Sequence, residues 1–477
     1  MYEEKFQAAA TLVKESRDRE GLDALLPLID ENPEDFRLYA VIGEAFMNSR
    51  MFDPAEKALV MANDLHHDKF IQIRLADCYT CQRKFAKAKP MLDKLKAQFI
   101  GTIDAPLWAC SQAEYLSATG KYDEAEKLYA WVIQEVPHWP TPWGGLGNLN
   151  ALQHRYERAV HCWGIHHQLR PTWRTAIDLC YGYGIADKWT EAYELGRWSY
   201  ITKEGDKRYL GHPEWDGKDC DEVLVCADGG LGDLLQYSRY INLIKGNVKL
   251  WVQKRHYEVA RCLRFDKPVE LIESYKDVDK SVPLAWLMFL PGVMGMPRPQ
   301  EAPSPVRADF GTIKMPQPAI AISWYGDLKH ANDHLRSTRL AQWARLILKF
   351  PQVHWFTVNP DKKAAKEIAS TRLPVTQYCT SLRDACRYLA TADAYVGVDT
   401  GHAHVAATAG KPSLCLLVNW VDNRWTAAGN RTNLYPDFLL YRGYEYPRLK
   451  DAIDEMAEDL ENILVTRNNQ GAQAIAG

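Results

Sequence analysis

The N-terminal part of the sequence repeats itself with a spacing of 33 to 37 residues. A small residue recurs at this spacing, an aromatic residue follows it, and an alanine follows the aromatic three residues later. Small residues let two antiparallel helices approach, and aromatic rings fill the space between them. One such helix pair cannot bury its apolar face alone, so several must stack. The five copies are Gly43/Phe52/Ala55, Ala76/Phe85/Ala88, Ala113/Tyr122/Ala125, Gly147/Tyr156/Ala159 and Cys180/Trp189/Ala192.

The fourth copy is the clearest and resembles the tetratricopeptide repeat (TPR). It reads Trp143-x-x-Leu146-Gly147-x-x-Asn150, followed by Tyr156, Ala159, Trp163 and Pro171. The resemblance implies an all-α TPR superhelix over residues 1–206, with about five repeats between Asp35 and Asp206 and a helical cap before them. The alternative interpretation is an irregular helical domain.

Composition limits the class of protein. The net charge of −3 gives no global basic field of the kind that attracts nucleic acids or membrane surfaces. No segment has the roughly 18 apolar residues of a membrane span, and the charged start Met1–Lys5 does not look like a signal peptide. Eleven scattered cysteines, with a lone Cys78-x-x-Cys81, indicate buried thiols rather than a metal site or disulfides. We therefore expect a cytoplasmic, reduced protein.

The pattern changes after Lys203–Asp206, where short β-rich runs begin to alternate with helical stretches. Strands separated by helices imply parallel sheets. A proline-rich stretch from Pro297 to Pro305 divides this region, which predicts two Rossmann-like α/β halves over 207–312 and 313–467 and a disordered tail over 468–477. The predicted strands are Val223–Cys226, Val248–Val252, Val269–Ile272, Ala319–Trp324, Val353–Val358, Ala394–Val398 and Leu414–Val418.

A glycine-rich block, Asp228–Asp233, follows the first predicted strand and precedes a helix. Gly230 and Gly232 would let backbone N–H groups approach a ligand, and the helix start favours an anion. The carboxylate of Asp233 could accept a proton from an acceptor hydroxyl. A tight turn with Asp233 as a helix cap is the competing interpretation.

A second block, Asp399–His404, lies where another predicted strand opens into a helix. The free N–H groups of the helix start could hold a diphosphate. Asp399 could hydrogen-bond sugar hydroxyls, and His404 lies one turn into the helix. The alternative is a capped helix start with a polar face.

Two further blocks follow strands of the second half. In the first, Trp324 is followed by Lys329 and Arg336, cations that could neutralise phosphate or form only a solvated loop. In the second, Asn419–Trp425 leads to Tyr435 and Pro436, whose aromatics suit either stacking on a base or sugar or simple packing.

Together these blocks resemble the heptosyltransferase-like glycosyltransferases, in particular bacterial members fused to TPR repeats. The resemblance covers roughly 250 residues plus the repeats and implies the two-domain GT-B architecture. The sequence departs from the commonest pattern at Asp228, Gly229, Leu335 and Thr338, which bears on the acceptor and the sugar. The matching residues are Gly230–Asp233, Trp324, Gly326, His330, Asn332, Asp333, Arg336, Ser337, Asp399, Thr400, His404, Arg424, Trp425, Tyr435 and Pro436.

The resemblance implies an inverting enzyme that transfers a sugar from a nucleoside diphosphate sugar to an acceptor hydroxyl, in a cleft between the halves. Asp233 would be the general base, and Gly230 and Gly232 would form the turn beside the acceptor. Neither a metal nor any other cofactor is implied, and Asp219-Cys220-Asp221 and Asp277-Val278-Asp279 are poorly placed for a metal. The implied donor-binding residues are Trp324, Lys329, Asn332, Arg336, Asp399, Thr400, Gly401, His402, His404 and Arg424.

Three questions stay open. The chain could instead be a non-catalytic scaffold with a degenerate transferase region. Repeat arrays present concave surfaces to extended chains, which favours a polypeptide acceptor or protein partner. A glycan or lipid-linked acceptor is the alternative at the level of the family. A modified DNA base is a further possible acceptor, although the cluster Lys254, Arg255, Arg261 and Arg264 is more typical of a solvated face.

Overall fold

A computed structural model of the chain describes residues 2–202, 211–327, 333–378, 380–418, 421–425, 429–443 and 448–476. Its internal contacts define two compact units. One comprises Met1–Ala186 with Glu194–Tyr209, and the other comprises Asp187–Tyr193 with Leu210–Gly477. We refer to them as the helical unit and the α/β unit.

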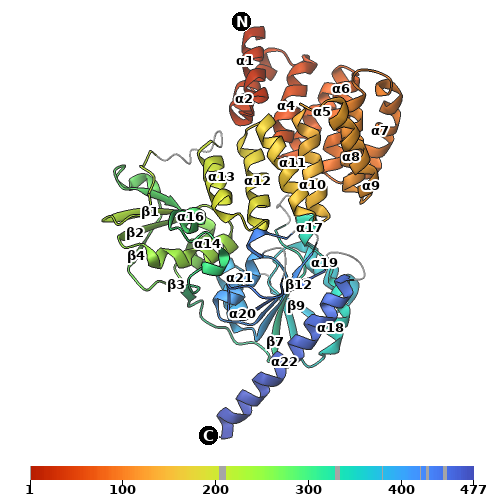
Figure 1. Cartoon of the computed structure of the whole chain (residues 1–477). Helices are drawn as coiled ribbons and strands as arrows, with labels where there is room; N and C mark the ends of the chain where they lie inside the picture. Colours follow the sequence, from red (N-terminus) through yellow and green to blue (C-terminus); the bar gives the residue numbers. More distant parts are fainter. Residues whose placement is uncertain are drawn as a thin grey trace. The chain divides into compact units, whose positions relative to one another are not determined.

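The helical unit is an array of antiparallel helix pairs, drawn from red to yellow in Figure 1. Among the described residues, three helices precede five pairs, which confirms the TPR-like superhelix predicted from the repeats. The leading helices are α1 (Tyr2–Lys14), α2 (Asp18–Leu25) and α3 (Leu28–Glu31). The pairs are α4 (Phe36–Asn48) with α5 (Phe52–Leu65), α6 (Lys69–Cys81) with α7 (Phe85–Phe99), α8 (Ala105–Ala118) with α9 (Tyr122–Glu135), α10 (Pro140–Leu152) with α11 (Tyr156–Leu169), and α12 (Trp173–Ile185) with α13 (Trp189–Thr202).

The small residues of the repeats allow the close approach between paired helices. A Cβ added at Gly43 would lie 2.6 Å from Cγ of Leu59, and one at Gly147 would lie 2.5 Å from Cδ1 of Trp163. Ala76 and Ala113, at the equivalent positions, are completely buried. The turn inside each pair also repeats, with one residue in the left-handed region: Arg50, Arg83, Gly120, His154 and Asp187.

The α/β unit contains two parallel sheets, as expected for two Rossmann-like halves. The first has the order β4-β2-β1-β5 and the second the order β12-β11-β10-β7-β8-β9. A two-stranded antiparallel ladder joins β3 (Leu263–Arg264) to β6 (Arg307–Ala308). The first sheet comprises β1 (Glu222–Ala227), β2 (Asn247–Val252), β4 (Val269–Ile272) and β5 (Leu284–Trp286). The second comprises β7 (Ala319–Ser323), β8 (His354–Thr357), β9 (Val375–Gln377), β10 (Ala394–Val398), β11 (Ser413–Leu417) and β12 (Phe438–Arg442).

The strand order of the second sheet reverses between β7 and β10, which are direct neighbours. Ligands of open parallel sheets bind beyond the carboxyl ends of strands at such a reversal. Trp324 follows β7 and Asp399 follows β10, so two of the predicted blocks lie at this point.

Helices cover the sheets of the α/β unit. They are α14 (Leu231–Tyr237), α15 (Tyr257–Ala260), α16 (Leu290–Val293), α17 (Asp333–Arg336), α18 (Ala344–Lys349), α19 (Lys362–Thr371), α20 (Leu382–Thr391), α21 (Gly401–Thr408) and α22 (Arg448–Ala476). The last helix continues to Ala476, whereas the sequence suggested a disordered tail from residue 468. Alanine and glutamine dominate its final turns, and both residues favour helix over coil.

Candidate active site

Asp233 lies in the first turn of α14, directly after β1 and the glycine-rich turn. Its Oδ2 accepts a hydrogen bond of 2.8 Å from the backbone N–H of Gly230. The contact satisfies one N–H group at the helix start, so Asp233 does perform part of the capping role that the sequence left open. Its other oxygen, Oδ1, remains for a second partner.

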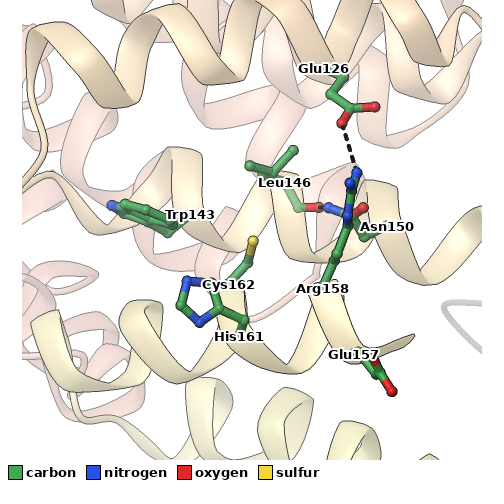
Figure 2. A pocket seen from close by; sticks show the side chains of 8 residues that line it. All are labelled: Glu126, Trp143, Leu146, Asn150, Glu157, Arg158, His161 and Cys162. Atoms are coloured by element: carbon green, nitrogen blue, oxygen red, sulfur yellow. Dashed lines mark hydrogen bonds and ion pairs between the residues drawn. The ribbon is translucent and has the colours of Figure 1, made fainter. Parts of the chain in front are cut away.

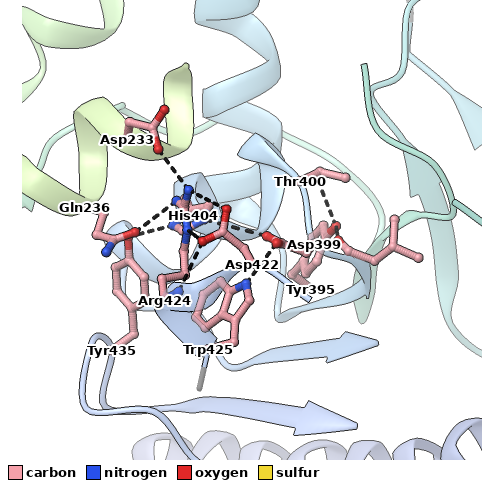
Figure 3. Close-up of polar contacts among 11 residues, drawn as sticks. Asp233, Gln236, Tyr395, Asp399, Thr400, His404, Asp422, Arg424, Trp425 and Tyr435 are labelled. Carbon is pink, nitrogen blue, oxygen red and sulfur yellow. Dashed lines mark hydrogen bonds and ion pairs between the residues drawn. The ribbon is translucent and has the colours of Figure 1, made fainter. Parts of the chain in front are cut away.

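That partner is Arg424, which reaches Asp233 from η7 (Asn423–Trp425), more than 190 residues later. The two form an ion pair of 2.9 Å, with 15% of the Arg424 and 19% of the Asp233 side chain exposed. The guanidinium also donates to Oε1 of Gln236 at 2.9 Å and to both oxygens of Asp422, at 2.9 and 3.0 Å (Figure 3). Arg424 therefore joins the first and fourth sequence blocks through one planar group.

Asp399 extends this network at the carboxyl end of β10. Its Oδ2 accepts a hydrogen bond of 2.8 Å from Nε1 of Trp425, and its Oδ1 lies 3.8 Å from Nε2 of His404. Burial raises the pKa of the Asp399 carboxyl above its ordinary value, an effect that the nearby Arg424 and Arg336 cations oppose. For the neighbouring Asp422, the Arg424 cation outweighs burial, and the pKa is lowered.

His404 is a packing residue in this structure. Its side chain is 2% exposed, stacks on Trp425 with ring centroids 5.4 Å apart, and shares a 3.0 Å hydrogen bond with the Tyr435 hydroxyl. Burial holds the pKa of its imidazole well below the usual range, so the ring is neutral. A Cβ added at Gly232 would lie 2.7 Å from Cδ2 of His404. Gly232 thus lets α14 and α21 pack directly against each other.

The start of α21 is held in place by contacts with β7 and β10. The Thr400 hydroxyl lies 3.2 Å from the hydroxyl of Tyr395, which donates to the carbonyl of Val398. His402 Nδ1 lies 3.0 Å from Oγ of Ser323, the last residue of β7, and burial lowers the pKa of His402 to about 4. No side-chain cap covers the helix start in the part of the chain that the structure describes.

The third sequence block is divided in the structure. Arg336 lies against Gly326, where an added Cβ would come within 2.7 Å of its Nη2, and its Nε is 3.5 Å from Oδ1 of Asp333. The Trp324 side chain, in contrast, is completely buried in the core and offers no surface to a ligand. Lys329 and Asn332, two further predicted donor-binding residues, lie outside the described residues, as does His330 of the matched motif.

Sequence reasoning missed Gln236 and did not single out Asp422 or Tyr395. Gln236 follows Asp233 by three residues on the same helix, a spacing that places both on one face and could have identified it. No local signal marks Tyr395, since it reads as one more apolar strand residue.

The described residues offer neither a metal site nor a membrane-spanning helix. Within the described ranges, no three His, Cys, Asp or Glu side chains are grouped so that they could hold a metal ion. No described helix has both the length and the apolarity needed to cross a membrane.

A known protein family matches the segment that contains part of this site. Residues 341–435 match the model of glycosyltransferase family 9 (heptosyltransferase). The C-terminal region therefore carries a glycosyltransferase family 9 domain, which confirms the resemblance seen in the sequence and supports glycosyltransferase activity. The matched segment includes Asp399–His404 and Arg424, while Asp233 and Arg336 lie outside it. No curated protein sequence matches the chain.

Several solved structures are similar to part of the chain. A tetratricopeptide repeat protein from Parabacteroides merdae has a TM-score of 0.35 and 12% identity, covering 43% of this chain and 80% of its own. PilW, a type IV pilus biogenesis factor, has a TM-score of 0.31 and 14% identity, covering 42% and 93%. The human IFIT1 dimer with PPP-AAAA has a TM-score of 0.37 and 16% identity, covering 44% and 52%.

Proposed function

We propose that the protein is an inverting, metal-independent glycosyltransferase that moves a sugar from a nucleoside diphosphate sugar to an acceptor hydroxyl. One observation carries this proposal: Arg424 joins Asp233, beyond β1, to a polar cluster that ends at Asp399, beyond β10. A base and a donor site must be neighbours for direct displacement, and these contacts support the proposal that Asp233 and Asp399 serve as such a pair.

In the proposed reaction, Asp233 accepts the proton of the acceptor hydroxyl as that oxygen attacks the anomeric carbon. The bond from the anomeric carbon to the nucleoside diphosphate oxygen breaks, and the diphosphate leaves with the electron pair. Arg424 orients the Asp233 carboxylate through its 2.9 Å contact. The base must lie within hydrogen-bond reach of the hydroxyl, which a fixed carboxylate achieves more often than a mobile one.

The leaving diphosphate would be stabilised by the start of α21 at Thr400, Gly401 and His402 and by Arg336. Helix N–H groups and a guanidinium are suited to this because they meet developing negative charge without rearranging. Lys329 and Asn332 belong to the proposed donor site on the strength of the sequence motif alone. Asp399 would bind donor hydroxyls, whereas His404 and Trp324 would act by supporting the fold around them.

The helical unit would bind the acceptor or a protein partner, and a polypeptide is the chemistry that a repeat array suits best. Within this proposal the protein acts in the cytoplasm. A scaffold without activity is the alternative, and the intact polar network around Arg424 weighs against it.

The decisive experiment is a transfer assay with Asp233→Asn and Asp233→Ala over a panel of sugar nucleotides and acceptors. We expect both variants to lose transfer by a factor of about 100 or more, as is typical for removal of a general base. Donor binding, read as thermal stabilisation by the sugar nucleotide, should persist. Near-normal transfer by a folded Asp233 variant would falsify the base assignment.

A second variant tests the donor side. Asp399→Asn should reduce thermal stabilisation by the donor while leaving the melting temperature without donor close to that of the parent protein. An unchanged donor-induced shift would mean that Asp399 only supports Trp425.

A further inference from the structure

The helical unit contains a pocket of about 390 Å³ in its fourth repeat (Figure 2). Its lining residues lie on α9, α10 and α11. The pocket is therefore formed by the two helices of the fourth repeat together with the second helix of the third. The lining residues are Glu126, Trp143, Leu146, Asn150, Glu157, Arg158, His161 and Cys162.

The pocket exists because one repeat carries a small polar residue where the others carry a large apolar one. Asn150 stands three residues after the small residue Gly147. The TPR pattern places a tyrosine at this position. The four other repeats carry Phe46, Tyr79, Leu116 and Tyr183 there. An asparagine fills less of the gap between helices than any of these side chains, and the hollow is the result.

Asn150 also brings an unused hydrogen-bond acceptor to the pocket. Its Nδ2 donates to the carbonyl of Leu146 at 2.8 Å, which fixes the orientation of the amide because only nitrogen can donate. The side chain is 3% exposed, and within the described structure its Oδ1 has no hydrogen-bond partner. A buried carbonyl oxygen without a donor is unfavourable, so a ligand that supplies a donor would be favoured here.

The walls formed by Trp143, Leu146, Cys162 and Glu126 are apolar or electrically balanced. Glu157, Arg158 and His161 line the pocket with exposed polar side chains. Trp143 and Leu146 offer apolar surface, and the Trp143 indole is held by a 3.0 Å hydrogen bond from its Nε1 to the carbonyl of Pro137. Burial raises the pKa of the Cys162 thiol to about 11, so this wall carries no charge. Glu126 is paired with Arg155 at 2.9 Å and approached by Arg158 at 3.7 Å, so it offers no unbalanced charge to a ligand.

We infer that this pocket receives an uncharged aromatic side chain that carries a hydrogen-bond donor, tryptophan or tyrosine, from a polypeptide bound to the helical unit. The ring would pack on Trp143 and Leu146, and its N–H or O–H would donate to Oδ1 of Asn150. Buried tryptophan and tyrosine side chains usually form a hydrogen bond through their polar atom, and here Oδ1 of Asn150 would accept it. The inference rests on the proposed function only in taking the ligand of this unit to be a polypeptide.

The test uses the full chain and N-acetyl-L-tryptophanamide as probe, observed by saturation-transfer NMR. We expect saturable binding, with roughly fivefold weaker binding of the 1-methyl analogue, which lacks the indole donor. Asn150→Tyr restores the residue typical of the repeat and should abolish binding by filling the pocket. Asn150→Ala removes the carbonyl and leaves the pocket open, and should bind both probes equally. Lys127→Ala, an exposed change on α9 outside the lining, is the matched control.

Three outcomes would overturn the inference: no saturable binding, binding that survives Asn150→Tyr, or equal affinity of both probes for the parent protein. The last would identify an apolar hollow whose carbonyl is satisfied by water. None of these depends on transfer, which is measured separately with the Asp233 variants. A folded Asn150→Tyr variant is expected because tyrosine occupies this position in two other repeats.

Discussion

Both units use a glycine to admit an aromatic ring, but over very different distances along the chain. In the helical unit, Gly147 of α10 makes room for Trp163 of α11, which belongs to the same repeat. In the α/β unit, Gly232 of α14 makes room for His404 of α21. The helix α14 follows a strand of the first sheet, and α21 follows a strand of the second. A small residue recurs at the position of Gly147 in the other repeats, whereas Gly232 occurs once and has polar groups beside it.

The difference lies in what each contact positions. The ring of Trp163 fills a helix pair, and its indole N–H is satisfied by Asn148 at 3.1 Å within the same repeat. The ring of His404 lies between Trp425 and Tyr435, and Trp425 in turn binds Asp399. Packing in the α/β unit is thus coupled to the polar network, while packing in the repeat serves the repeat alone.

Removing one arginine from each unit should give the largest difference between the two units in stability and in transfer. Arg424→Ala leaves Asp233, Asp422 and Gln236 without their shared partner, and we expect a loss of about 3 kcal/mol in the free energy of unfolding together with loss of transfer. Arg158→Ala removes a pair at 3.7 Å whose arginine is 67% exposed, and should cost below about 1 kcal/mol. Denaturant unfolding and transfer assays provide the measurements. Equal costs for the two variants would contradict the comparison.

Adding a methyl group at each glycine tests the packing itself. Gly232→Ala and Gly147→Ala should each cost about 2 kcal/mol, because neither ring has space to move freely. Hydrogen exchange, measured peptide by peptide on the full chain, should localise each loss to its own unit. Only Gly232→Ala should also weaken thermal stabilisation by the donor, since it displaces His404 and with it the neighbours of Asp399. A weaker donor-induced shift in Gly147→Ala would show that the repeat has a wider role.

Both units should lose stability in acid. Burial lowers the pKa of His256 in the α/β unit and of His166 in the helical unit to about 4 in each case. The unfolded chain takes up protons near pH 6.5, so stability is present above that pH and is lost as the pH falls toward 4. We expect a loss of about 1 kcal/mol for His256 between pH 7 and pH 5.5. His256→Gln should flatten the dependence of melting temperature on pH in this range, and a steeper profile would refute the assignment.

The sequence predicts the repeats and most strands because their signals are local. The spacing of Gly43, Ala76, Ala113, Gly147 and Cys180 is enough to place five helix pairs, and seven strands are found close to their predicted positions. The strands β5 and β9 have three residues each, too few to show a pattern, and β12 was not among the predicted strands.

The sequence indicated which residues belong to the candidate site, but not which of them contact one another. Asp233, Asp399 and Arg424 could be selected because each follows a strand or belongs to a motif. Arg424 bridges Asp233 and Asp422 because two segments nearly 200 residues apart pack against each other. No local sequence pattern encodes such a contact. For the same reason, the buried positions of Trp324 and His404 could not be distinguished from exposed ones in the sequence.

The last helix of the α/β unit has a consequence for how this protein is made. Ile453, Met456, Leu460 and Leu464 of α22 belong to the core that covers one face of the second sheet. The hydroxyl of Tyr441 in β12 also donates a hydrogen bond of 2.5 Å to the carboxylate of Asp459 in this helix. During synthesis the strands β7 to β11 leave the ribosome before α22 does, so this apolar face stays uncovered until the helix follows. Nascent chains that stall before residue 464 should therefore be strong clients for chaperones that bind exposed apolar strands.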